Sequence, residues 1–543
     1  MTFTRRDIIR FGTLGAVAAV LPAQRLLLDR RQAGADPNAC IADRVLTGDV
    51  NMPDGFTVPP GETWIFDPAA TTTVTVTRNV VVEGTLRMRP ANPGVVHTLR
   101  FNGVDEDAFV GGHTMTPLAT DVGLWVIGMG ELDAQGTPRA GWNRTGTDPT
   151  WLTTDELVVA PTAPGDYGMF VQFAPFTLGA TPPAVTAPDG TVHTAEVVNL
   201  TRNVRIEGTP EHRAHVMFVG CQRPQTLRHL AIRWMGPTKD TGGTYYGGSY
   251  GQLPIDKNVS GRYGLHFHHC ADGVRGTLVE GVVVRDIGGN GFVSHLSNGI
   301  TYRDCVAYDL RDNGYWWDEA SQSHDIVYDG CAAMLVRPMP HFEGYNTHGF
   351  MLGEGNGLVA KNCVAVAVQG NNVNAGGFHW PRSASSVWLF EDNVAHNNRG
   401  PGIGVWGNDD KPHVLTRVST YRNTFGILHG AYLNNYAYRD ISAFGNETDL
   451  YHLALGNIIY ERAKFGGVTI GNHVLQSPSA TRFVDCVFGG QIAVNETEGQ
   501  PGTFRFESST PATDLTPAKF YVLHKLSTIT VHNSDSTTFE VTA

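Results

Sequence analysis

A short segment that places Cys or Asn before Val-Ala or Ala-Ala recurs in the middle of the chain. Its four copies are Arg303–Ala307, Asp329–Ala333, Lys361–Ala365 and Glu391–Ala395, and they follow one another every 26 to 32 residues. A repeat of this length, made of short strands with Gly and Asn turns, is typical of a solenoid. Each coil of a solenoid buries its inner residues only by stacking on the next coil, so the repeat predicts one continuous stacked core.

The repeats indicate strands rather than helices. Helical repeats need 3.6-period segments rich in Leu and Ala, and such segments are scarce here. Glycine is abundant, with 63 residues, and Asn-Gly pairs at 290–291, 298–299 and 313–314 punctuate the apolar runs. We therefore predict an all-β fold, a right-handed parallel β-helix. A β-propeller is the alternative, but its blades of four strands need longer repeats.

The cysteines of the repeat are expected to be buried thiols. If the coils stack, Cys305, Cys331, Cys363 and Asn393 occupy the same position in successive coils and form one interior column. The chain has seven cysteines, an odd number, which does not suggest a disulfide framework. One bridge, for instance from Cys40, remains open.

The N-terminus resembles an export signal. Thr4–Phe11 (TRRDIIRF) matches the twin-arginine pattern and leads into the apolar run Phe11–Val20. That run is too short to span a bilayer, and the chain has no other segment of about 18 apolar residues, so no integral membrane segment is predicted. We expect a secreted, extracytoplasmic protein. The predicted parts are a signal and linker (1–34), a glycine-rich β module (35–150), the β-helix (151–480) and a C-terminal β cap (481–543).

Composition excludes few functions. With 41% hydrophobic and 17% charged residues the chain is ordinary for a globular protein. The net charge of −12 does not suit nonspecific binding of nucleic acid, so nucleic acid is not an expected partner. The sequence leaves the oligomeric state open.

The segment Leu265–His269 (LHFHH) points to a site. Alternate residues of a strand face the same side, so His266 and His268 should point outward together while Leu265 and Phe267 point into the core. His295 and Asp318 follow His268 at steps of 27 and 23, close to one coil each. Because parallel strands lie about 4.8 Å apart, we predict that His268, His295 and Asp318 form a column.

This column favours metal chemistry. Three imidazoles and one carboxylate suit a divalent transition metal such as Zn, Mn or Fe, and the predicted ligands are His266, His268, His295 and Asp318. Calcium prefers oxygen ligands and would bind loop carboxylates elsewhere. His268, His295 and Asp318 are also the candidate catalytic residues. The alternative is a ladder of Asn and His that stabilises the solenoid without any reaction.

Further residues are candidates for binding a polysaccharide. His348 and His379 are expected to extend the row of histidines. Arg262 could bind a uronate or sulfate, since guanidinium binds such anions through two hydrogen bonds. Tryptophans that face outward could stack on sugar rings. Alternation places Trp316 outward with Asp318, and Trp380 and Trp406 lie at matching positions.

The chain resembles the family of proteins with the eight-glycine domain over residues 45–360. The resemblance implies an extracellular β-helix that acts on, or binds, glycosaminoglycan-like polysaccharides, with calcium important for some members. Gly264 departs from the proline that is usual in the family. The matching segments are Val58–Leu132, Gly136–Trp142, Leu200–Ile206, His215–Phe218, Arg228–Gly236 and Gly261–His268.

These observations together predict a secreted carbohydrate-active enzyme that depolymerises an acidic polysaccharide with a His/Asp site, assisted by a metal. Hydrolysis by paired carboxylates is less favoured, because Asp318 and Glu319 are neighbours on an extended strand and point in opposite directions. A noncatalytic polysaccharide-binding or adhesion protein and a metal-dependent oxidoreductase are the alternatives.

Overall fold

The chain divides into two units, Met1–Ile41 and Ala42–Ala543, and a computed structural model describes most of the second. The predicted export signal, Cys40 and Trp406 lie outside the described residues. Side chains at 240–257, 409–410, 433–434 and 455–456 are not described either. The described residues are 43–163, 171–246, 252–318, 322–339, 347–370, 375–380, 386–405, 409–430, 433–453, 455–471, 480–497 and 501–542.

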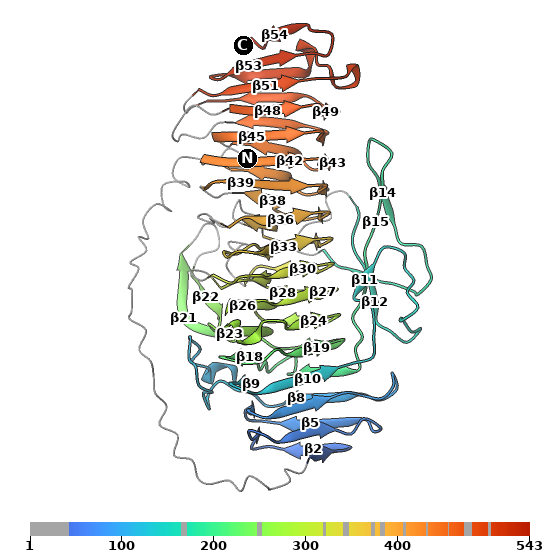
Figure 1. The fold of residues 1–543 in the computed structure, drawn as a ribbon, viewed down its shortest axis with the longest axis vertical. Coiled ribbons are helices and arrows are strands. Elements are labelled where there is room, and N and C mark those ends of the chain that lie inside the picture. Colours follow the sequence, from blue (N-terminus) through green and yellow to red (C-terminus); the bar gives the residue numbers. More distant parts are fainter. Residues whose placement is uncertain are drawn as a thin grey trace. The chain divides into compact units, whose positions relative to one another are not determined.

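Three long sheets of stacked strands build the described unit (Figure 1). Sheet A runs from β1 (Arg44–Leu46) to β54 (Thr538–Glu540), sheet B from β2 (Asp49–Met52) to β49 (Val487–Phe488), and sheet C from β3 (Phe56–Val58) to β52 (Phe520–His524). Strand pairs along these sheets are parallel, except for β54, which pairs antiparallel with β53 (Thr528–His532). The predicted all-β parallel β-helix is therefore confirmed.

Stacking in register sorts the side chains into interior columns. Phe292, Tyr315, Phe350 and Phe378 occupy one position in four successive coils, and their rings stack with centroids 4.8, 4.4 and 4.7 Å apart. They belong to one apolar core that extends from Leu46 to Val541. The predicted column of Cys305, Cys331, Cys363 and Asn393 is also present. The backbone N–H groups of Ala332, Val364 and Val394 donate to the carbonyl oxygens of Cys305, Cys331 and Cys363, one coil before. All four residues are fully or almost fully buried, and the cysteines are free thiols.

The predicted boundaries inside the β-helix are wrong. We expected a separate module over 35–150, but β4 (Thr63–Phe66), β7 (Thr85–Met88) and β10 (Glu131–Gln135) are the first strands of sheet A and continue in parallel into β19 (Thr226–Arg228). The expected cap at 481–543 likewise continues the coils through β51 (Thr503–Glu507). Both segments bury the same central core, so neither needs an interior of its own.

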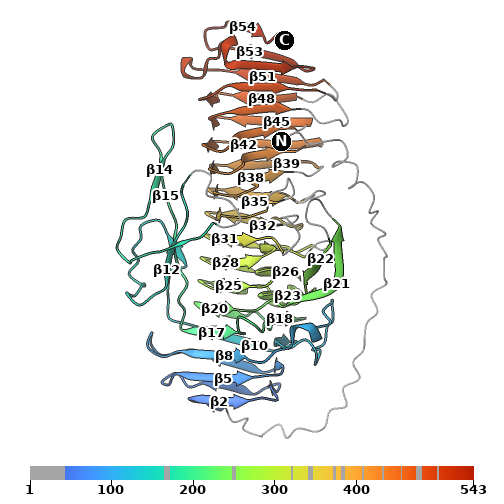
Figure 2. The same cartoon turned by 180° about the vertical axis from the view of Figure 1, so that it is seen from behind.

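Two insertions leave the coils. Residues of the first form sheet D, whose apolar side packs on sheet B (Figure 2). The second is an antiparallel hairpin of β21 (Thr238–Tyr246) and β22 (Gln252–Asn258), next to β23 (Leu265–Ala271) and β26 (Phe292–Ser297) (Figure 1). The strands of sheet D are β11 (Trp142–Asn143), β12 (Leu157–Val159), β13 (Ala174–Pro175) and β16 (Val197–Asn199).

Among the described residues, the helical segments are short 3-10 turns such as η1 (Glu106–Ala108) and η3 (Asp272–Val274). None of these segments has the length and apolar character that a membrane-crossing helix requires.

The aromatic column should carry much of the core's stability. Phe350, in β32 (His348–Met351), is fully buried between two stacked rings, so Phe350→Ala should lower the free energy of unfolding by about 3–5 kcal/mol. Leu389, in β36 (Trp388–Glu391), is 54% exposed, and Leu389→Ala should change the free energy of unfolding by no more than about 0.5 kcal/mol. Urea unfolding of both variants measures the difference; equal losses would contradict the stacked core.

Candidate metal centre

The predicted site lies on sheet C, where β23 and β26 pair in parallel after β18 (Val216–Val219) (Figure 1). The register pairs His268 directly with His295. Leu265 and Phe267 point into the core as expected. His266 and His268 lie on the opposite side of the strand, but other elements cover them, and both are fully buried.

The predicted column of His268, His295 and Asp318 comes together in the structure. Nδ1 of His295 lies 3.1 Å from Nδ1 of His268 and 3.4 Å from Oδ2 of Asp318. Asp318 follows β29 (Asn313–Trp316), in which Trp316 pairs with Val293. His266 adjoins the column, with its ring centroid 5.0 Å from that of His268.

Two further histidines, His113 and His269, belong to the cluster, and the sequence did not predict either of them as a site residue. His113 lies on the loop between η1 and β9 (Leu124–Ile127), and its ring centroid is 5.3 Å from that of His295 and 5.7 Å from that of His268. This loop is far from β23 in sequence and belongs to no repeat, so no spacing pattern could have identified His113.

His269 joins the cluster because the strand breaks its alternation. Its φ of 51° is left-handed, and the pairing with β26 shifts register between His268 and Ala271. The His269 ring therefore lies beside two rings of the column, with centroids 4.3 Å from His268 and 4.8 Å from His295. His269 is exposed, whereas its two neighbours in the cluster are buried. The adjacent pair His268-His269 was visible in the sequence, but its bulge was not.

The cluster contains two overlapping sets of potential metal ligands. His113, His268 and His295 form one, and His266, His295 and Asp318 form the other. Within each set the potential ligand atoms all lie within 4.8 Å of one another. His295 belongs to both sets, so it is the centre of the site.

The environment keeps the imidazoles of His266, His268 and His295 neutral. Burial, together with the neighbouring histidines, lowers the pKa of His268 to about 3 and that of His295 to about 4. Burial also holds the pKa of His266 well below its usual range. Neutral imidazole is the form that binds metal ions. Nε2 of His266 and Nε2 of His268 are buried and have no hydrogen-bond partner among the described residues.

Two predicted substrate-binding residues are not available to a polysaccharide. Arg262 is fully buried, and its Nε lies 2.8 Å from Oδ2 of Asp121, so the prediction that it binds a substrate anion is wrong. Trp380, in β35 (Gly376–Trp380), is part of the central core. It points inward because Phe378, two residues earlier on the same strand, is also a core residue.

The other predicted substrate-binding residues have different surroundings. His348 and His379 are buried and pair with each other at a ring-centroid distance of 4.9 Å, and Nδ1 of His348 lies 2.7 Å from Oδ1 of Asn313. Neither ring is exposed to a polymer.

Trp316 is partly exposed, and its ring packs edge-on against that of Tyr263. The ring centroid of Tyr263 in turn lies 4.9 Å from that of His266. Of the predicted tryptophans in the described part of the chain, Trp316 is the one at the edge of the cluster.

A cleft of about 420 Å³ lies away from the histidines, beside the first insertion. Several of its polar groups bind one another: Nε1 of Trp142 donates to the Gly330 carbonyl oxygen, and Nδ2 of Asn362 donates to Oδ1 of Asp329 at 3.2 Å. The histidine cluster on sheet C is therefore the better candidate site.

Comparison with known proteins adds little beyond the fold. The chain matches no protein-family profile, and no curated protein matches it. Similar solved structures include a family 28 exopolygalacturonase of Yersinia enterocolitica (TM-score 0.25, 10% identity, 85% of this chain and 78% of that chain). The tailspike of Pseudomonas phage phi297 also matches (TM-score 0.22, 9% identity, 84% of this chain and 75% of that chain). So does the tailspike of Pseudomonas phage LKA1 (TM-score 0.16, 9% identity, 84% of this chain and 69% of that chain). Likenesses this weak have no bearing on the function of this chain.

The buried histidines should make stability depend on pH in the metal-free protein. Because the folded pKa values of His268 and His295 lie below the unfolded value of about 6.5, the unfolded chain binds more protons on acidification. Stability should be complete above pH 6.5 and fall by up to about 1.4 kcal/mol per pH unit for each histidine as the pH drops towards 4.

Urea unfolding in the presence of a chelator, at several pH values between 7 and 4, measures this slope. His295→Gln should reduce the slope of the free energy of unfolding against pH by the contribution of one histidine. A free energy of unfolding that is the same in both proteins at every pH would show that His295 is not held neutral.

Proposed function

We propose that the histidine cluster binds a divalent transition metal ion, Zn, Mn or Fe, and that the protein is a secreted metal-dependent enzyme that depolymerises an acidic polysaccharide. The observation that carries the metal is the convergence of His268, His295 and Asp318 at 3.1 and 3.4 Å. Resemblance to the eight-glycine-domain family supports the class of substrate. Secretion rests on the twin-arginine pattern of Thr4–Phe11.

The separations between these atoms fit ligands of one ion. Two nitrogens that bind zinc at 2.0–2.1 Å in a tetrahedral site lie about 3.3 Å apart. A ring nitrogen carries at most one proton, so Nδ1 of His295 can make only one of its two close contacts as a hydrogen-bond donor. An ion bound by His295 within either ligand set would replace the contact that has no proton. The donor set is poor in oxygen, which does not suit calcium.

The residues around the column have separable roles in this proposal. His295 would hold the ion together with His113 and His268 in one ligand set, or with His266 and Asp318 in the other. Such an ion, when bound, supplies a Lewis acid and lowers the pKa of coordinated water.

Two side chains, one exposed and one partly exposed, face the substrate in this proposal. His269 belongs to neither ligand set and is exposed beside the column, so it is the group best placed to exchange protons with a substrate. Trp316, at the edge of the cluster, offers a ring for a sugar to stack on.

A second function deserves a test because the ligand set His266, His295 and Asp318 contains two histidines and one carboxylate. This combination, with open positions, is typical of non-haem iron oxygenases. A metal-dependent oxidoreductase is therefore the alternative, and polysaccharide shortening against oxygen consumption separates the two functions.

Metal content is the first test of the proposal. The purified full chain should contain about one equivalent of Zn, Mn or Fe by elemental analysis. His295→Ala should weaken metal binding by at least about 100-fold, since it removes the ligand shared by both sets. His532→Ala, at an exposed histidine of β53, is the matched control and should bind like the unaltered chain. Equal metal content in the two variants would overturn the site.

Activity is then measured on a panel of acidic and neutral polysaccharides. Shorter chains, with or without new unsaturated ends, should appear with the unaltered protein and not with His295→Ala. Binding without shortening would indicate a noncatalytic module, and oxygen consumption with iron would indicate the oxidoreductase.

A further inference from the structure

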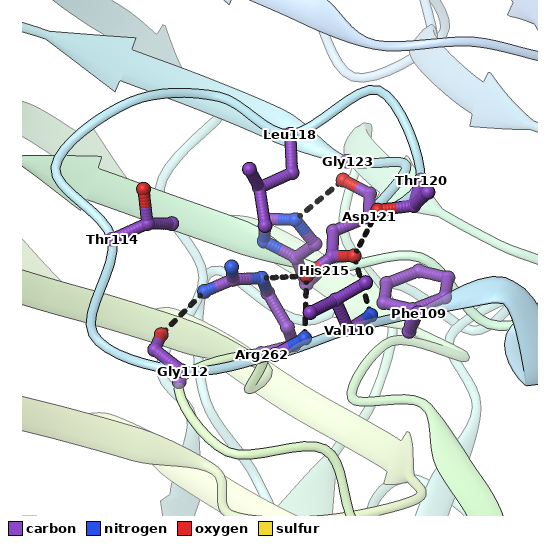
Figure 3. A network of polar contacts seen from close by, with 12 residues as sticks. Phe109, Val110, Gly112, Thr114, Leu118, Thr120, Asp121, Gly123, His215 and Arg262 are labelled. Carbon is purple, nitrogen blue, oxygen red and sulfur yellow. Dashed lines mark hydrogen bonds and ion pairs between the residues drawn. The ribbon is translucent and has the colours of Figure 1, made fainter.

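A buried ion pair links the loop that carries His113 to the strand that carries His266 and His268. Arg262 precedes β23, Asp121 precedes β9, and both side chains are fully buried with Nε and Oδ2 2.8 Å apart (Figure 3). Burying two charges is costly, and such pairs are best explained where they fix one arrangement of the chain.

The ion pair holds the three residues that come directly before His113. The Asp121 carboxylate accepts hydrogen bonds from the backbone N–H of Val110 at 2.7 Å and of Gly111 at 2.8 Å. Nη1 of Arg262 donates to the Gly112 carbonyl oxygen at 3.2 Å (Figure 3). A loop tied at three consecutive positions leaves the next residue little freedom to move.

The backbone of the loop that carries His113 also contacts the backbone of the segment before β23. The N–H of Gly112 donates to the carbonyl oxygen of Ser260 at 2.8 Å. A Cβ atom on Gly111 would lie 2.9 Å from Val259 Cγ1 and 3.0 Å from the Ser260 oxygen, and φ at Gly111 is +73°. Glycine is therefore required for this contact.

The same segment orients a second histidine of the cluster. The Gly261 carbonyl oxygen lies 2.9 Å from Nδ1 of His266, which fixes the ring and leaves Nε2 as its other nitrogen. The Arg262 guanidinium rests over the Trp125 ring, 4.8 Å from the ring centroid. Nε2 of His215 lies 3.1 Å from the Asp121 carbonyl oxygen (Figure 3). The ion pair is thus fixed from both sides.

We propose that Asp121 and Arg262 are positioning residues that hold His113 against His268 and His295 as a metal ligand. His113 is the exposed member of its ligand set and the one carried by a loop rather than by a sheet. The inference rests on the proposed metal centre, because it assigns His113 a place in that centre. A purely structural ion pair would stabilise the fold without affecting the ligands.

Titration of the full chain with Co²⁺ separates these roles, because the visible spectrum of Co²⁺ reports its ligands and needs no substrate. His113→Ala and Arg262→Lys should each weaken Co²⁺ binding by about 10–100-fold and change its spectrum in the same way. In the double variant the effects should not add, because both act through His113.

The matched control is Asp133→Asn, which removes a buried carboxylate paired with Arg87 and Arg89 on sheet A. It should leave the Co²⁺ spectrum unchanged. Gly111→Ala disturbs the loop without altering a charge and should reproduce Arg262→Lys, which keeps the test available if the lysine variant does not fold.

Three outcomes would overturn the inference. Arg262→Lys and Gly111→Ala could leave the spectrum and affinity unchanged, or their losses could add in full to that of His113→Ala, which would mean that the ion pair acts only on the fold. Failure of the unaltered chain to bind Co²⁺ or Zn²⁺ would instead contradict the metal centre itself, and the inference with it.

Discussion

Stacking of parallel strands in register is the constraint on which this molecule depends. It brings residues one coil apart to about 4.8 Å on the same side of a sheet. Inside the β-helix this stacking forms a column of aromatic rings, Phe292 to Phe378, and a column of cysteines. On the other side of sheet C the same register sets His268 against His295. The core and the candidate site are therefore consequences of one geometry.

Stacking is favourable for the aromatic rings of the core, but it costs free energy at the candidate site. Aromatic rings gain contact area when they stack, whereas imidazoles in a buried cluster lose solvation and repel one another if protonated. The depressed pKa values of His268 and His295 express this cost. A cluster held neutral, with Asp318 next to His295, is prepared for a cation. In this account the bound ion offsets the unfavourable burial of the polar groups.

The sequence predicted what the repeat controls. The fold and the meeting of His268, His295 and Asp318 followed from the period alone, since each residue sits one coil from the next. His269 was missed because its left-handed backbone breaks the alternation, and a single sequence does not reveal such a bulge. His113 was missed because loops obey no period.

The errors have the same origin. Arg262 was expected at the surface, but the loop ending at Asp121 covers it, and local sequence patterns do not record which loop covers a strand. Trp380 and His379 were both predicted to face a substrate, although neighbours on one strand point in opposite directions, and Trp380 is the one that faces the core. Applying alternation strictly would have corrected this prediction.

An anomalous diffraction map, recorded from crystals of the full chain at the absorption edge of the metal found in it, tests the account most directly. We expect one strong peak in the cluster, about 2.0–2.2 Å from the ligand atoms of His295 and of the other two members of one ligand set, His113 and His268 or His266 and Asp318. An empty map, with the His268 and His295 rings bonded directly to each other, would contradict it and leave a polar ladder that only stabilises the coils.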